Sequence, residues 1–180
     1  MAKAVPTARL SIPLRRPERF VMSPEGSCIM FRRVPDELRR PVERFASRLR
    51  SEVTKGRPFD CVITSDAELR RLNREFRGED YATDVLSFPV GHALACPKDV
   101  WASSSMPHLG DLAISLPRAR SQARAFGHAT AQEIQILMLH GVLHLLGMDH
   151  ETDRGGMARA EKRWRARLGL PIGLIERVPL

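Results

Sequence analysis

Residues 130–146 carry a helical pattern that is apolar on nearly every face, and this segment constrains the fold more than any other. Its large apolar residues are Ile134, Ile136, Leu137, Met138, Leu139, Val142, Leu143, Leu145 and Leu146. A helix without a polar face must be surrounded by other elements, so we expect it at the centre of its domain. The apolar run is shorter than the roughly 18 residues that a bilayer crossing needs, and we predict no membrane partner.

The length and the charge set the next limits. The chain has 180 residues, which fits one domain, and its 43% of hydrophobic residues can form a core. The net charge is +8, and 25 of the 29 basic residues are arginine, whose planar guanidinium matches phosphate geometry. These features favour a polyanionic partner, with nucleic acid as the first candidate. A GC-rich genome, in which arginine codons accumulate, would produce the same composition without any such partner.

The N-terminal segment differs from the rest of the chain. Residues 1–27 hold four of the thirteen prolines, show no lasting periodicity and begin with a strongly basic stretch. We therefore predict a basic, disordered extension over 1–27 and a single domain over 28–180. Two alternatives remain open, namely a transit peptide or a start of translation at Met22 or Met30.

The cysteine pattern and the N-terminus together indicate the compartment. The three cysteines have no zinc-ribbon spacing, and no secretory apolar segment is found near the start: Cys28, Cys61 and Cys96. The prediction is a cytoplasmic protein.

The remaining periodicity predicts a small mixed fold. Strands are expected at 28–31, 59–64, 83–88 and 109–114, and helices at 36–49, 65–76, 116–126, 130–146 and 153–168. Capping boxes at 65–68 and 130–133 open two of the helices. This order predicts the α+β class: a single small domain with an about four-stranded mixed sheet, helices packed on it, and a buried central helix.

Three histidines lie within and just after the central helix. His140 and His144 are four residues apart, so they share one helix face. Gly147 can end the helix in a left-handed conformation, which lets the chain reverse and bring His150 back. Three converging imidazoles suit one zinc ion, and three protein ligands leave a fourth position open for chemistry. A structural role in the core fits one histidine better than it fits this set.

The residue after the first histidine separates two kinds of chemistry. The spacing equals that of the metallopeptidase motif H-E-x-x-H-x-x-G-x-x-H, whose glutamate is the general base. Here that position is Gly141, which can neither accept nor deliver a proton. Hydrolysis of a phosphodiester depends less on such a carboxylate, because a metal can polarise the phosphoryl oxygen. The pattern therefore favours phosphodiester cleavage over proteolysis.

Three segments of the chain together resemble a known family. Residues 140–150, HGVLHLLGMDH, resemble the H-G-x-L-H-L-x-G-x-D-H signature of the YbeY family of bacterial endoribonucleases. Residues 72–89, LNREFRGEDYATDVLSFP, and residues 109–114, LGDLAI, are similar to two further segments of that family. Ala82 departs from the family pattern, which has proline at that position.

The resemblance implies an activity and a set of site residues. It implies a zinc-dependent, single-strand-specific endoribonuclease in late small-subunit ribosomal RNA maturation and ribosome quality control. His140, His144 and His150 would be the ligands of one zinc ion, and Arg77 would be the catalytic arginine. The implied partners are a ribosomal RNA precursor and the ribosome or small-subunit assembly proteins. We expect a monomer.

The roles of the other polar residues are less constrained by the sequence pattern. Asp84 and Asp111 either line the cleft and orient the ligands or are strand-end turn residues. Asp149 is expected to shape the turn before His150. The histidines in loops are expected to be exposed to solvent: His92, His108 and His128.

Two other functions remain as alternatives. The first is a ribosome-associated RNA-binding assembly factor whose metal is structural. The second is a metallopeptidase whose general base comes from elsewhere, such as Glu133 or Asp84.

Overall fold

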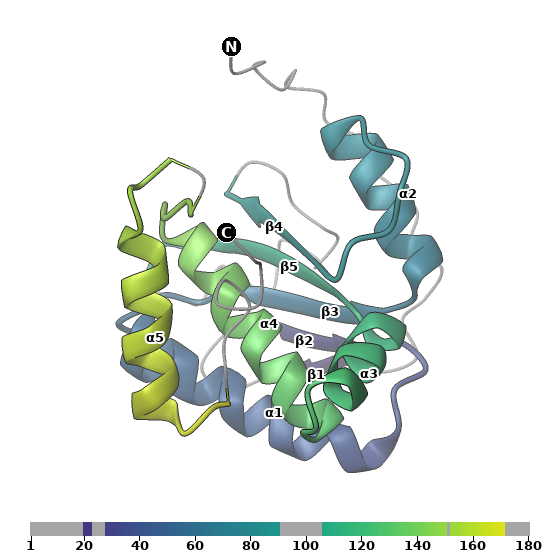
Figure 1. The fold of residues 1–180 in the computed structure, drawn as a ribbon, viewed down its shortest axis with the longest axis horizontal. Helices are drawn as coiled ribbons and strands as arrows, with labels where there is room; N and C mark the ends of the chain where they lie inside the picture. The colour runs from purple at the N-terminus through teal and green to yellow at the C-terminus, as the bar shows by residue number, and fades with distance from the viewer. Residues whose placement is uncertain (1–19, 23–27, 91–105, 151, 172–180) are drawn as a thin grey trace.

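The computed structural model describes residues 20–22, 28–90, 106–150 and 152–171 (Figure 1). They contain a five-stranded sheet in the order β1-β2-β3-β5-β4. The strands are β1 (Phe20–Met22), β2 (Cys28–Phe31), β3 (Asp60–Thr64), β4 (Val85–Pro89) and β5 (Gly110–Ser115). The neighbouring strands β2, β3 and β5 run parallel, and β1 and β4 pair antiparallel at the two edges. The prediction of an α+β fold with a mixed sheet is confirmed.

Five α-helices accompany the sheet in the described part of the chain. They are α1 (Asp36–Arg48), α2 (Asp66–Arg77), α3 (Leu116–Ala125), α4 (Thr130–Leu145) and α5 (Gly156–Leu168), and a π-helical turn η1 (Leu49–Val53) continues α1. Alternate strand residues point to opposite faces. Ile29, Cys61 and Leu112 pack in one cluster with residues of α1, α3, α4 and α5. Met30, Val62 and Ala113 pack with α2 on the other face. The sheet therefore separates α2 from α4.

Helix α4 is the central helix that its sequence predicts. It contacts β4, β5, α1, α3 and α5, and Figure 1 shows it beside α5 and across the sheet. Most of its side chains are buried, including Ile134, Leu137 and Val142. No helix among the described residues has the length and apolar character needed to span a membrane.

One strand of the sheet was not predicted. Strand β1 pairs with β2, with Phe20 opposite Met30, so the prediction that all of 1–27 is a disordered extension is wrong for Phe20–Met22. A three-residue strand is too short to show an alternating pattern, which explains the omission. The predicted extension at 1–19 and 23–27 lies outside the described residues, as do residues 91–105.

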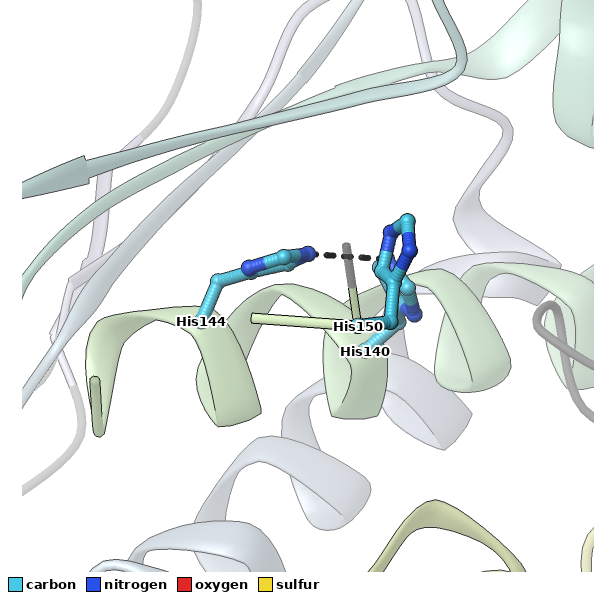
Figure 2. A group of neighbouring side chains, drawn as sticks. All are labelled: His140, His144 and His150. Carbon is cyan, nitrogen blue, oxygen red and sulfur yellow. Dashed lines mark hydrogen bonds between the residues drawn. The ribbon is translucent and has the colours of Figure 1, made fainter. Parts of the chain in front are cut away.

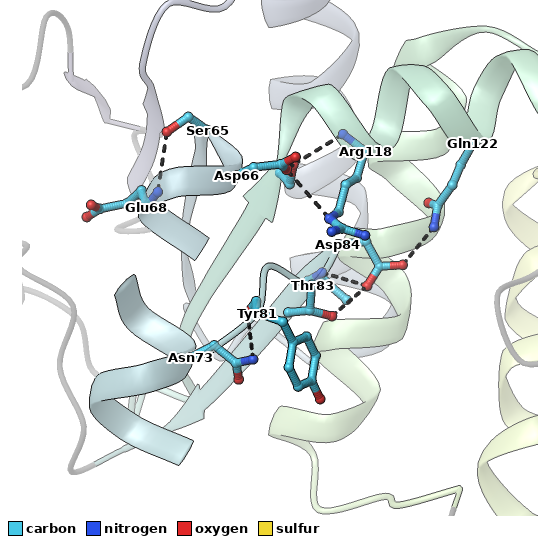
Figure 3. A network of polar contacts seen from close by, with 11 residues as sticks. Ser65, Asp66, Glu68, Asn73, Tyr81, Thr83, Asp84, Arg118 and Gln122 are labelled. Atoms are coloured by element: carbon cyan, nitrogen blue, oxygen red, sulfur yellow. Dashed lines mark hydrogen bonds and ion pairs between the residues drawn. The ribbon is translucent and has the colours of Figure 1, made fainter. Parts of the chain in front are cut away.

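Two helix starts differ in detail from the expected capping boxes. Ser65 accepts a hydrogen bond from the Glu68 amide as predicted (Figure 3). The Glu68 carboxylate, however, accepts hydrogen bonds from Arg71 instead of reaching back. At α4 the N-cap is Ala129, whose amide donates to Gln132 Oε1 at 3.0 Å. Glu133 therefore does not cap the helix, and its carboxylate contacts His128.

Candidate metal centre

The three histidines of the motif come together at the C-terminal end of α4. Figure 2 shows His140 and His144 on one face of the helix, with His150 returning from the following turn. One ligand nitrogen from each ring lies within 4.8 Å of the others. The Nε2 atoms of His140 and His144 are 3.2 Å apart. The structure thus contains a possible three-histidine metal site, and the role of each histidine as a ligand stays a prediction.

The turn that returns His150 depends on a helix stop. Gly147 has a φ of +86°, the left-handed region that glycine adopts without strain. Its amide donates to the His144 carbonyl at 2.9 Å, and the Met148 amide donates to Leu143 at 3.1 Å, which closes the helix end. The Asp149 carbonyl then accepts from the amides of Thr152 and Asp153. These contacts agree with the expected role of Asp149 in shaping the turn.

The geometry and the protonation of these rings fit a tetrahedral metal ion. Two imidazole nitrogens bound to zinc at about 2.0–2.1 Å lie about 3.3–3.4 Å apart, close to the separation seen between His140 and His144. The pKa of His144 is lowered to about 4, first by burial and then by His140 and His150. That ring is therefore neutral at pH 7, which is the form that binds a metal. His140 is buried whereas His150 is exposed, so the group is open to solvent on one side.

A carboxylate from α5 supports the most buried histidine. His140 Nδ1 lies 2.9 Å from Glu161 Oε2, and both side chains are almost fully buried. The sequence pattern did not single out Glu161 as a site residue. The available signal was its place on the inward face of a strongly basic helix, where Met157, Ala160 and Leu168 are also buried.

Gly141 occupies the position of the peptidase glutamate and faces the sheet. A Cβ atom added there would lie 2.7 Å from Leu112 Cδ2 and 3.2 Å from Ser87 Oγ. The Gly141 carbonyl also accepts a hydrogen bond from Ser87. A side chain at this position would force Leu112 to shift, so a glycine suits the close packing of α4 on β4 and β5.

No hydrogen bond or ion pair among the described residues joins Arg77 to the histidines. Arg77 lies exposed at the last residue of α2, before the left-handed Gly78, and it forms no hydrogen bond or ion pair with any described residue. Helix α2 packs on the opposite face of the sheet from α4. Its neighbours Arg70 and Arg74 both pair with Asp80. The catalytic role of Arg77 stays a prediction.

Asp84 is used to hold the start of β4. Its Oδ1 accepts from the Val85 amide at 2.8 Å and from the Thr83 hydroxyl at 3.2 Å (Figure 3). Its Oδ2 accepts from Gln122 Nε2 of α3 at 2.9 Å. Because both oxygens are engaged in joining β4 to α3, the geometry favours the strand-end reading over a role at the cleft.

Asp111 belongs to a second polar group rather than to the histidine triad. It lies opposite Asp60 on neighbouring parallel strands, and His108 Nε2 is 3.6 Å from Asp60 Oδ1. The Gly110 amide donates to His108 Nδ1 at 3.0 Å, so a neutral ring carries its proton on Nε2, facing the carboxylate. A proton on Nε2 opposes metal binding through that atom.

Two loop histidines expected at the surface are instead largely buried. The side chain of His108 is 13% exposed and that of His128 is 8% exposed. His128 Nε2 lies 2.5 Å from Glu133 Oε2, and its ring stacks on Phe126. The prediction of solvent exposure is wrong for both, because their acidic partners become neighbours only after folding. His92 lies outside the described residues.

The fold and the site together define a small α+β protein with a possible three-histidine metal site at the end of a buried helix. A family model described as Endoribonuclease YbeY matches residues 31–169. The chain belongs to the YbeY family.

Individual proteins extend this similarity. An Endoribonuclease YbeY of Solibacter usitatus is 68% identical over 157 residues, covering 87% of this chain and 97% of that protein. One of Nautilia profundicola is 44% identical over 119 residues, covering 66% of this chain and 78% of that protein. A solution structure from Thermotoga maritima matches with a TM-score of 0.51 at 27% identity, covering 78% of this chain and 87% of that one. The resemblance noted in the sequence is confirmed.

Proposed function

We propose that this protein is a zinc-dependent, single-strand-specific endoribonuclease that matures the ribosomal RNA of the small subunit. The observation that carries the proposal is the convergence of His140, His144 and His150 at one point. The family match and the endoribonuclease names of the relatives supply the reaction class. One zinc ion is the proposed cofactor because three converging imidazoles with an open side match its catalytic coordination.

The residues around the triad divide the work of such a site. A bound zinc ion would polarise a phosphoryl oxygen and generate a nucleophile from water at neutral pH. His140 and His144 hold their nitrogens in place from a rigid, buried helix, while His150 lies on the solvent side where RNA arrives. Arg77 is proposed to neutralise charge that develops on the phosphate, as arginine does in phosphoryl chemistry.

The exterior supports an RNA substrate. The net charge is +8, and most of the basic residues are arginine. The exposed face of α5 carries Arg159, Lys162 and Arg163. Such a surface binds phosphate without reading sequence. The proposed partners are a ribosomal RNA precursor and the ribosome or its small-subunit assembly proteins. We further propose that the protein is a monomer and that it is located in the cytoplasm.

The packing disfavours proteolysis. Glu133 is 0% exposed and bound to His128, and both oxygens of Asp84 accept hydrogen bonds. Gly141 carries no carboxylate, and a side chain there would crowd Leu112. None of the three positions can therefore supply the general base that a metallopeptidase needs.

The test uses the full chain and a labelled RNA that contains the 3′ precursor of the small-subunit RNA. Elemental analysis should give one zinc per chain, and the zinc-loaded protein should cut the RNA while His140→Ala does not. Equal cleavage by the two proteins would reject the metallonuclease. A zinc-loaded protein that binds RNA without cutting it would instead support the assembly factor with a structural metal.

A further inference from the structure

Glu161 is a buried acidic residue of α5, so it does not act at the protein surface. It is the only acidic residue of α5, whose outward residues are largely basic. Its own side chain points inward toward α4, which runs beside α5 in Figure 1, and only 2% of the residue is exposed. The single described group that it binds is His140, at 2.9 Å from Nδ1. The contact therefore joins α5 directly to His140, the most buried histidine of the triad.

We infer that Glu161 is a positioning residue for the metal centre, an inference that rests on the proposed function. With the Glu161 carboxylate accepting a hydrogen bond from His140 Nδ1–H, the lone pair of the ring lies on Nε2. That is the nitrogen that faces His144 Nε2 at 3.2 Å. The carboxylate thus selects the tautomer and the ring orientation that a metal requires, and it raises the basicity of the ligand.

The charge of Glu161 supports the same inference independently. Its second oxygen, Oε1, is buried and accepts no hydrogen bond from a described residue. A buried carboxylate with one hydrogen bond is unfavourable unless a positive charge lies nearby. A divalent cation on the far side of the His140 ring would supply that charge. A bound ion would in this way link metal binding to the packing of α5 on α4.

The same molecule offers a matched control at the other end of α4. Glu133 is also fully buried and pairs with a histidine, His128, at 2.5 Å. This pair uses the Nε2 atom of its histidine and lies outside the group that brings His140, His144 and His150 together. Loss of either glutamate removes a buried partner of a histidine, but only Glu161 contacts a predicted ligand.

The experiment compares Glu161→Gln and Glu161→Leu with Glu133→Gln in the full chain stripped of metal. Zinc affinity is measured by competition with a chromophoric chelator, and the ligand geometry is followed by the absorption bands of bound cobalt(II). We expect Glu161→Leu to weaken zinc binding by about 10–100-fold and to change the cobalt bands. Glu161→Gln should have a smaller effect because it keeps an acceptor oxygen. Glu133→Gln should lower the melting temperature and leave the zinc affinity unchanged.

The outcomes separate this inference from the proposed function. Equal zinc affinity and an unchanged cobalt spectrum in both Glu161 variants would overturn the inference while the metal centre stands. A wild-type protein that binds no zinc would overturn the metal centre and the inference together. If Glu161→Leu does not fold, Glu161→Gln decides, because it nearly preserves the size of the side chain.

Discussion

The two ends of α4 carry the same chemical pair, a buried histidine bound to a buried glutamate, in two different settings. Near its start, His128 directs Nε2 toward Glu133, five residues away, and stacks on Phe126. Near its end, His140 directs Nδ1 toward Glu161 of α5 and leaves Nε2 facing His144. The nitrogen that the carboxylate engages therefore decides whether the other ring nitrogen faces a metal site. We call the His140 end of α4 the open end, because its Nε2 faces the other histidines, and the His128 end the closed end.

The largest effect is expected from removing the ring at the open end. His140→Ala should abolish RNA cleavage and weaken zinc binding by more than the roughly 100-fold that loss of an outer partner costs. Titration with zinc and a gel assay of the labelled RNA measure the two effects. His128→Ala is the control, since it removes a buried ring at the closed end. A similar loss of zinc affinity in both variants would show that the two ends do not differ in function.

A substitution at the closed end should lower the stability of the fold and leave zinc binding unchanged. Glu133→Ala leaves His128 without its 2.5 Å partner, and leaving a buried hydrogen-bonding group unpaired costs about 1–3 kcal/mol in the free energy of unfolding. Urea denaturation of the metal-free protein measures it. Variant protein that remains folded should bind zinc with wild-type affinity. A weakened affinity there would contradict the assignment of a purely structural role.

Between the two ends, the fit of α4 on the sheet can be tested at Gly141. Gly141→Ala introduces a Cβ 2.7 Å from Leu112 Cδ2, and overpacking of this kind costs about 1–3 kcal/mol. The melting temperature should fall, and zinc affinity should fall less than in His140→Ala. A variant as stable as the wild type would show that α4 can shift away from β5 at little cost.

The smallest effect is expected from a glutamate that is only partly buried. The Arg71 guanidinium lowers the pKa of Glu68 below its ordinary value of 4.5. Because the unfolded chain binds this proton first, the contribution is present above pH 4.5 and is lost as the pH falls through the lower folded-state pKa. Glu68→Gln should cost about 0.3–0.5 kcal/mol at pH 7 and less at pH 3, measured by urea denaturation. A cost as large as that of Glu133→Ala would remove the distinction between buried and exposed pairs.

The parts of the site that could be predicted are those encoded by local spacing. Two histidines four residues apart, a helix apolar all round and a glycine stop require no knowledge of distant segments. The helix stop at Gly147 is seen as expected, with a φ of +86°. The motif is therefore readable before any fold is known.

The parts that could not be predicted join distant segments or depend on a choice between partners. Glu161 meets His140 across 21 residues, and Asp60 meets Asp111 through the register of two parallel strands. Glu133 lies only five residues from His128, yet the sequence equally allowed it to cap the helix, a role that Gln132 takes. Such outcomes depend on which face of each element is buried.

By itself the sequence determined the central helix, the approach of its three histidines and the family of the chain, because these follow from periodicity and motif spacing. Only the tertiary structure decided which carboxylate supports which ring, that a side chain at Gly141 would crowd Leu112, and that α2 with Arg77 packs on the opposite face of the sheet from α4. The physical reason is that burial makes hydrogen-bond partners obligatory, and the available partner is the one that packing brings within reach.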